Sequence, residues 1–153
     1  MTDETFLSAL AAHGEHIPRS TLAAEIARGS PGRTRLLRLS THGKPSIRRW
    51  IVEGLAAFRT PAVHAALRAA LRDPAMTVRL HALNGIVAYR QQALYDDLPP
   101  LFSDPSGGIR LNLLAGLESI SHPALAGLLL IARADPKAYI RAWVQRRIGP
   151  MAG

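Results

Sequence analysis

The sequence contains no cysteine, few aromatic residues and no long apolar run. Without cysteine, the chain has no disulfide, no thiol nucleophile and no thiolate metal site. The longest apolar run, near Leu128 to Ala132, is far shorter than the roughly 20 residues that cross a bilayer as a helix. The acidic start, Met1 to Glu4, lacks the basic region of a signal peptide. We therefore expect a soluble cytoplasmic protein.

Acidic residues are scarce in one half of the chain. Residues 19–72 carry eleven Arg or Lys and two acidic residues, Glu25 and Glu53, which gives this segment a net charge of +9. The net charge of the whole chain is +8, so the rest of the chain is close to neutral. A basic half indicates attraction to a polyanion or to an acidic protein partner. Because 17 of the 19 cations are arginine, the excess is also explained as a general aid to solubility, and both readings stay open.

The sequence does contain a repeat with a period of 31 residues. Asp73-Pro74 leads into Val78-Arg79 and then Gly85-Ile86, and the pattern returns from Asp104-Pro105 and from Asp135-Pro136. A fixed period of this length is the signature of stacked helical units. We predict a single domain over 1–153, with an N-terminal cap and degenerate repeat in 1–43, regular repeats in 44–148 and a tail in 149–153.

Each regular unit is predicted to hold two helices. The first helices are expected near 46–58, 77–90, 108–120 and 138–148, and the second near 62–72, 93–103 and 124–134. Pro99 and Pro100 must interrupt the second of these. Before the regular units we expect helices over 3–13, from Ser20 or Thr21 to Gly29, and from after a Pro31-Gly32 turn to Gly43.

Spacing within the first helices predicts one buried stripe, with Ile47, Val78, Ile109 and Ile140 at its equivalent positions. Glycine recurs in the middle of these helices, at Gly54, Gly85 and Gly116. A glycine there costs about 1 kcal/mol relative to alanine. A cost repeated at one position indicates a close approach by a neighbouring helix.

The pattern Asp-Pro-x-x-x-(Val/Ile)-Arg, followed by an apolar residue and Gly-(Ile/Leu), resembles the short HEAT-like repeats of bacterial proteins, the type also found in phycobilisome lyases. The resemblance implies an all-α fold, a right-handed α-solenoid of antiparallel helix pairs. It also implies a structural ladder of Asp and Arg, here Asp73 with Arg79, Asp104 with Arg110, and Asp135 with Arg141. The first unit has His42 where the others have aspartate, so Arg48 is expected to lack its own acid.

Two surfaces are candidates for binding. Leucines and a valine lie opposite the buried stripe and tryptophans lie at its edge, which predicts an apolar patch for a protein partner or a second copy: Leu80, Val87, Leu111, Trp50 and Trp143. The alternative is a surface that binds a polyanion or nucleic acid. It would consist of arginines that have no aspartate at the position where the repeat places one: Arg33, Arg35, Arg38, Arg48, Arg49, Arg68 and Arg72.

Signs of catalysis are weak. His13-Gly14-Glu15-His16 is one cluster of possible metal ligands, but no second cluster completes a coordination shell. We find no glycine-rich phosphate loop and no paired-carboxylate signature, so no cofactor is expected. The sequence favours a non-enzymatic interaction module that binds a protein or peptide, with homo-oligomerisation as one form of this.

Overall fold

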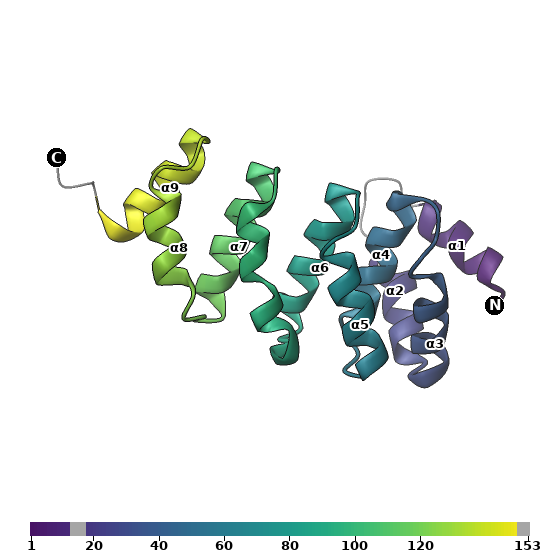
Figure 1. The fold of residues 1–153 in the computed structure, drawn as a ribbon. Coiled ribbons are helices and arrows are strands. Elements are labelled where there is room, and N and C mark those ends of the chain that lie inside the picture. The colour runs from purple at the N-terminus through teal and green to yellow at the C-terminus, as the bar shows by residue number, and fades with distance from the viewer. Residues whose placement is uncertain (13–17, 150–153) are drawn as a thin grey trace. The chain divides into compact units, whose positions relative to one another are not determined.

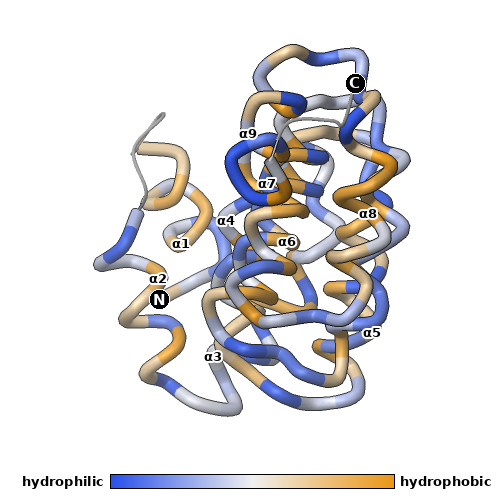
Figure 2. Tube along the Cα trace, turned by 90° about the vertical axis from the view of Figure 1, so that its left-hand side faces the viewer, coloured by the Kyte–Doolittle hydropathy of each residue, from blue (hydrophilic) through white to orange (hydrophobic). Residues whose placement is uncertain are grey.

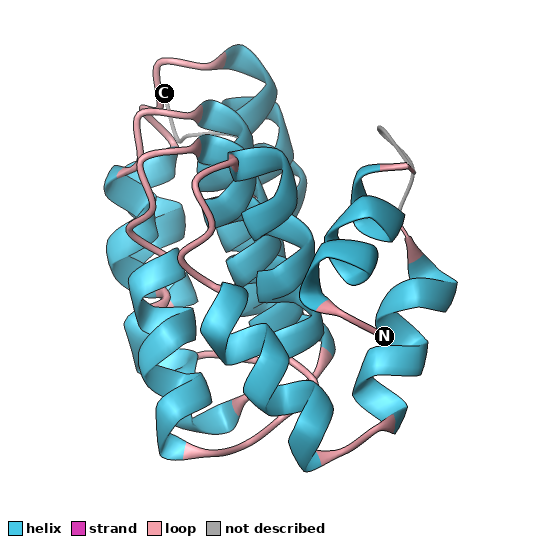
Figure 3. Ribbon diagram, turned by 90° about the vertical axis from the view of Figure 1, so that its right-hand side faces the viewer, coloured by secondary structure: helices cyan, strands magenta, loops and turns pink. Residues whose placement is uncertain are grey.

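The regular elements of the chain are helices (Figure 1). The computed structural model describes residues 1–12 and 18–149. The helices are α1 (Asp3–Ala11), α2 (Arg19–Ala27), α3 (Ser30–Leu39), α4 (Pro45–Leu55), α5 (Pro61–Ala70), α6 (Met76–Ala88), the 3-10 helices η1 (Gln92–Asp97) and η2 (Pro99–Ser103), α7 (Gly107–Ser119), α8 (Leu125–Ala132) and α9 (Ala138–Ile148). Figure 3 shows them joined by loops, with no strand in the described part. The all-α prediction is confirmed.

Packing divides the chain into two units, Met1–Leu94 and Tyr95–Gly153. In the first unit, α4 is the central helix and contacts α1, α2, α3, α5 and α6. Its buried residues Ile51 and Leu55 are fully enclosed, as are Leu36 of α3 and Leu67 of α5. Helix α4 is therefore the element around which the first unit is built.

In the second unit, α7 packs on η2 and on α8, and α8 packs on α9. The core between them consists of buried residues from these three α-helices: Leu114, Leu129, Ala132, Ile140 and Val144. Within the described ranges 1–12 and 18–149, no helix has the length and apolar character that a membrane crossing requires.

The predicted buried stripe is confirmed. Ile47, Val78, Ile109 and Ile140 are 5%, 1%, 0% and 0% exposed. Since these residues lie 31 places apart and come from four different helices, equivalent positions of the repeat occupy equivalent environments in both units.

Two of the three glycines inside the first helices, Gly54 and Gly85, allow the predicted close approach. A Cβ placed on Gly85 would lie 2.8 Å from the Cβ of Ala56, at the end of α4. On Gly54 it would lie 3.2 Å from Leu36 and 3.3 Å from Leu22. Each missing side chain thus lets a neighbouring helix pack directly against the backbone.

The double proline has the expected effect. Pro99 and Pro100 begin η2, and the segment predicted as one helix over 93–103 is two 3-10 helices. Proline lacks the N–H that a continuous α-helix needs at this place.

Two local predictions near the N-terminus are wrong. Pro31 and Gly32 do not form a turn but lie in the first turn of α3, where proline lacks only an N–H that has no helical partner. Helix α2 starts at Arg19 after Pro18, so neither Ser20 nor Thr21 is its N-cap. Gly29, with φ of 68°, does separate α2 from α3.

Candidate functional site

An arginine of the first regular helix is held by two sets of contacts. Arg48 donates from Nη1 to the carbonyl oxygens of His42, at 2.8 Å, and Gly43, at 3.1 Å. Its Nε and Nη2 each lie 2.9 Å from a carboxylate oxygen of Asp73. The Arg48–Asp73 ion pair therefore joins the start of α4 to the segment that follows α5, 25 residues later.

The same arrangement recurs 62 residues later, in the second unit. Arg110 donates to the carbonyl oxygens of Asp104 and Pro105, at 2.9 and 3.3 Å. Its Nε and Nη2 bind the carboxylate of Asp135 at 2.9 and 3.0 Å. Two repeat periods thus separate two ion pairs of matching geometry.

These contacts correct the predicted ladder. Arg79, Arg110 and Arg141 donate to the main-chain carbonyl oxygens of their expected partners, Asp73, Asp104 and Asp135. The carboxylates that Arg48 and Arg110 bind belong to the aspartates 25 residues further on. Arg48, expected to lack an acid, is therefore one half of a bidentate ion pair.

The repeat aspartates also form the turn that precedes each first helix. Oδ1 of Asp73 accepts from the amide of Ala75 at 2.8 Å, and Oδ1 of Asp135 accepts from the amide of Lys137 at 2.9 Å. In the first unit Nδ1 of His42 accepts from the amide of Lys44 at 3.1 Å. A histidine can therefore replace aspartate here, because the turn needs one acceptor at this place.

Electrostatics agree with a structural role for these pairs. Burial tends to raise the pKa of Asp135, but hydrogen bonds from Arg110 and the Lys137 amide, with the charges of Arg110 and Arg141, outweigh burial and lower it. The pKa of Asp73 is lowered by the same balance of burial and hydrogen bonds. Both aspartates are thus held as carboxylates by the arginines.

Three of the seven arginines in the predicted polyanion set are bound to acids of the chain. Arg35 is 7% exposed and binds Glu25 at 3.1 Å and Asp3 at 3.0 Å. Arg38 binds Asp3 at 2.7 Å, and this contact lowers the pKa of Asp3. With Arg48 bound to Asp73, all three residues lie in structural contacts that would compete with a polyanion.

The other four arginines come from three helices of the first unit and from the residues just after one of them. Arg49 stacks on the ring of Trp50 with 4.6 Å between the guanidinium carbon and the ring centre. Arg33 is half-buried in α3, whereas Arg68 in α5 and Arg72 just after it are exposed. Among these four, the exposed arginines therefore lie at the end of α5.

The predicted apolar patch is mostly packed against the protein itself. Trp50 is 2% exposed and meets the ring of His81 edge-on, with 4.9 Å between ring centres. It is therefore a core residue and not a surface anchor. Leu80 and Val87 of α6 are half-buried.

In the second unit, Leu111 and Trp143 pack against the hydrophobic core and are likewise half-buried. The guanidinium carbon of Arg147 lies 3.4 Å from the centre of the Trp143 ring and covers it. These two residues therefore present less apolar surface than the sequence predicted.

The two most exposed large apolar side chains among the described residues of the second unit lie on α8 instead. Leu130 and Ile131 are 61% and 62% exposed. No charged residue occurs in Leu125–Ala132, and Figure 2 shows α8 as a hydrophobic stretch. A helix that is apolar on its solvent side as well as its core side normally has both sides covered.

A groove with a volume of about 470 Å³ adjoins this surface. The groove is lined by residues at or just after the ends of η2 and α8 and by the Arg110–Asp135 ion pair. The lining includes Phe102, Pro105, Arg110, Ile131, Ala134 and Asp135. The lining therefore combines the ion pair with apolar side chains. Sequence reasoning missed this surface, although the uncharged run around Leu128 to Ala132 was its signal.

The first unit contains the equivalent groove with different residues. Its lining includes Ser40, Arg48, Ala69 and Asp73, each 62 places before a residue of the α8 groove. Leu67 of α5 and Leu129 of α8 confirm the register, since both are buried at equivalent positions. In that register, Arg68 and Ala69 take the places of Leu130 and Ile131.

Gln91 is a second residue that sequence reasoning missed. It is 1% exposed, and its side-chain amide donates to the carbonyl oxygens of Ala56, at 2.7 Å, and Phe58, at 2.6 Å. Its Oε1 lies 3.3 Å from Nε2 of His64. These contacts satisfy carbonyl groups that the end of α4 leaves without helical partners.

The possible metal cluster of the sequence, His13 to His16, lies outside the described residues. Within the described part of the chain, no three His, Asp or Glu residues come together as metal ligands. No known protein-family profile matches the chain, and no curated protein is significantly similar to it.

Proposed function

We propose that the chain is a right-handed α-solenoid of HEAT-like repeats that binds a protein partner, without catalysis, through the exposed face of α8. The matching Arg48–Asp73 and Arg110–Asp135 pairs support the repeat, because the same contact forms in both units at a spacing of two periods.

One observation supports placing the binding site on α8. At one repeat position the chain has Arg68 and Ala69 in α5, and Leu130 and Ile131 in α8. The fold therefore accepts a cation and a small residue there. Two adjacent side chains about 60% exposed are not required by the core, and exposed apolar surface of this kind marks protein contacts.

The partner would place apolar side chains of its own against Leu130 and Ile131. The groove beside them is lined by Phe102 and Ala134, which such a side chain could contact, and by Arg110 and Asp135. Polyanion binding, the alternative prediction, has less support because Arg35, Arg38 and Arg48 are bound to carboxylates of the chain.

The test uses a variant that the chain itself suggests. Leu130→Arg with Ile131→Ala gives α8 the residues of α5, and Met76→Arg is the matched control, since Met76 is 44% exposed in the first unit. Partners captured from a lysate by the wild-type protein are identified, purified and titrated against all three chains.

A partner that binds the wild type and Met76→Arg but not the double variant supports the proposal. Equal binding by the double variant contradicts it. Binding that disappears on nuclease treatment, or that weakens steeply with salt, would point to a polyanion instead.

A further inference from the structure

Another groove lies in the first unit. It has a volume of about 410 Å³ and is lined by residues of α2, the end of α4 and the end of α6: Arg19, Leu22, Ala23, Ile26, Glu53, Gly54, Ala88 and Tyr89. This volume falls in the range of about 300–1,000 Å³ found for ligand sites. The groove is therefore large enough for a side chain with the backbone on either side of it.

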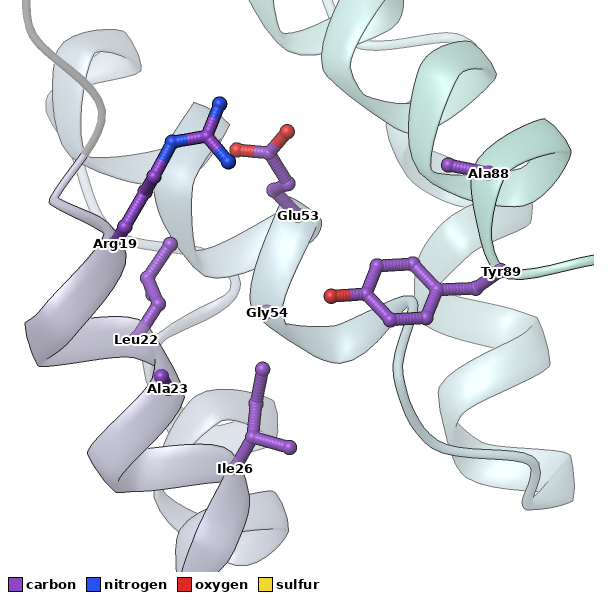
Figure 4. Close-up of a pocket in the computed structure, with 8 residues that line it drawn as sticks. All are labelled: Arg19, Leu22, Ala23, Ile26, Glu53, Gly54, Ala88 and Tyr89. Atoms are coloured by element: carbon purple, nitrogen blue, oxygen red, sulfur yellow. The ribbon is translucent and has the colours of Figure 1, made fainter.

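Figure 4 shows how the groove is built. Leu22 and Ile26 line its α2 side, and the hydroxyl of Tyr89 points toward them from the opposite side. Gly54 of α4 lies between these two sides in Figure 4, and Leu22 packs close to its backbone. The floor is thus apolar, with a hydroxyl at one side.

Two charged groups lie together at one end of the groove. Arg19 and Glu53 point toward the same region in Figure 4, each from a different helix. Oε2 of Glu53 is buried without a hydrogen-bond partner among the described residues, and Nδ1 of His81, 3.7 Å away, is unpaired in the same sense. Because Oε2 is enclosed while the Glu53 side chain as a whole is 27% exposed, Oε1 is the oxygen that can accept from a ligand in the groove.

These groups define the chemistry of the occupant. A guanidinium binds a carboxylate, a carboxylate accepts from an N–H, and the apolar floor takes an aliphatic side chain. One chemical unit combines all three at short range, namely the last residue of a peptide. The basic character of residues 19–72 favours the anionic end.

We propose that this groove binds the free C-terminus of a peptide that ends in an aliphatic residue. Arg19 receives the terminal carboxylate, Glu53 accepts from the last backbone N–H, and Leu22 and Ile26 contact the last side chain. The site shares no residue with the exposed face of α8, so either proposal can fail without the other.

The test is an NMR titration of the ¹⁵N-labelled full chain with a pentapeptide of serine and glycine that ends in leucine. The free-acid peptide should shift the amides of Gly54 and Tyr89, and the C-terminally amidated peptide should bind at least tenfold more weakly. Arg19→Gln should cause the same loss, whereas Arg72→Gln, an equal change in charge on an exposed residue outside the groove, should cause none.

Equal binding of the acid and the amide would overturn the assignment, as would equal loss in Arg19→Gln and Arg72→Gln. Binding of free leucine as tight as that of the peptide would also overturn it, since the site would then be one for an amino acid. A shift pattern centred on α8 would place the peptide at the other site and reject this one.

Discussion

The ion pair between Arg110 and Asp135 is expected to contribute far more to stability than a surface pair. The Arg110 side chain is 11% exposed and that of Asp135 is 3% exposed. Arg110→Leu would leave the carboxylate buried with the Lys137 amide as its remaining hydrogen-bond donor in the contacts described above. Breaking a buried pair in this way costs about 3–5 kcal/mol.

The measurement is a double-mutant cycle with Arg110→Leu and Asp135→Ala, using urea unfolding followed by circular dichroism. Two further cycles provide the comparison. Arg48–Asp73, with both side chains 13% exposed, should show a smaller coupling, and Arg147–Glu118, 30% and 44% exposed, should show none that is resolved. A coupling for Arg110–Asp135 no larger than that for Arg147–Glu118 would refute this reasoning.

Four other changes test separate parts of the structure. Because the pKa of Asp73 and Asp135 is lowered on folding, their stabilisation should be complete above the unfolded value of about 3.9 and lost as pH falls through the lower folded values. Arg110→Leu removes the hydrogen bonds and the charge of Arg110 that lower the pKa of Asp135, so the stability deficit of this variant relative to wild type should shrink at low pH; an equal deficit at pH 7 and pH 3 would contradict this. Gly85→Ala should destabilise by about 1–2 kcal/mol because its Cβ meets Ala56, whereas Gly127→Ala in α8, with open space around it, should stabilise by about 0.5 kcal/mol; equal melting shifts would reject the close approach. Gln91→Ala should cost about 1–3 kcal/mol in urea unfolding, because the carbonyl groups of Ala56 and Phe58 lose their donor, and an unchanged midpoint would count against that role. Leu130→Arg with Ile131→Ala should change the unfolding free energy by less than about 1 kcal/mol, and a collapse of helicity would show that these residues belong to the core.

The core was predictable because it depends on spacing. A period of 31 residues places Ile47, Val78, Ile109 and Ile140 in equivalent environments, and all four are buried. The close approach at Gly54 and Gly85 followed from the cost of a mid-helix glycine. Because these positions recur in each repeat, the residue found in one unit supports the structural prediction for the equivalent residue in the next.

Contacts that depend on the choice between neighbouring repeats were not predictable. The sequence places one aspartate 6 residues before Arg110 and another 25 residues after it, and spacing does not decide which carboxylate is bound. Trp50 lies at the edge of the buried stripe in sequence, but the ring of His81 from α6 covers it. To predict the exposed apolar surface of α8 from the sequence, Leu130 had to be compared with Arg68 at the same repeat position.

Calorimetric titration of a purified partner tests the central proposal most directly. Full burial of a leucine or isoleucine side chain contributes about 1.5–3 kcal/mol, so side chains about 60% exposed retain about 1–2 kcal/mol each for a partner. Leu130→Arg with Ile131→Ala is therefore predicted to raise the Kd by roughly 30-fold or more, while Met76→Arg leaves it unchanged. A Kd for the double variant within a factor of two of the wild-type value would contradict the proposal.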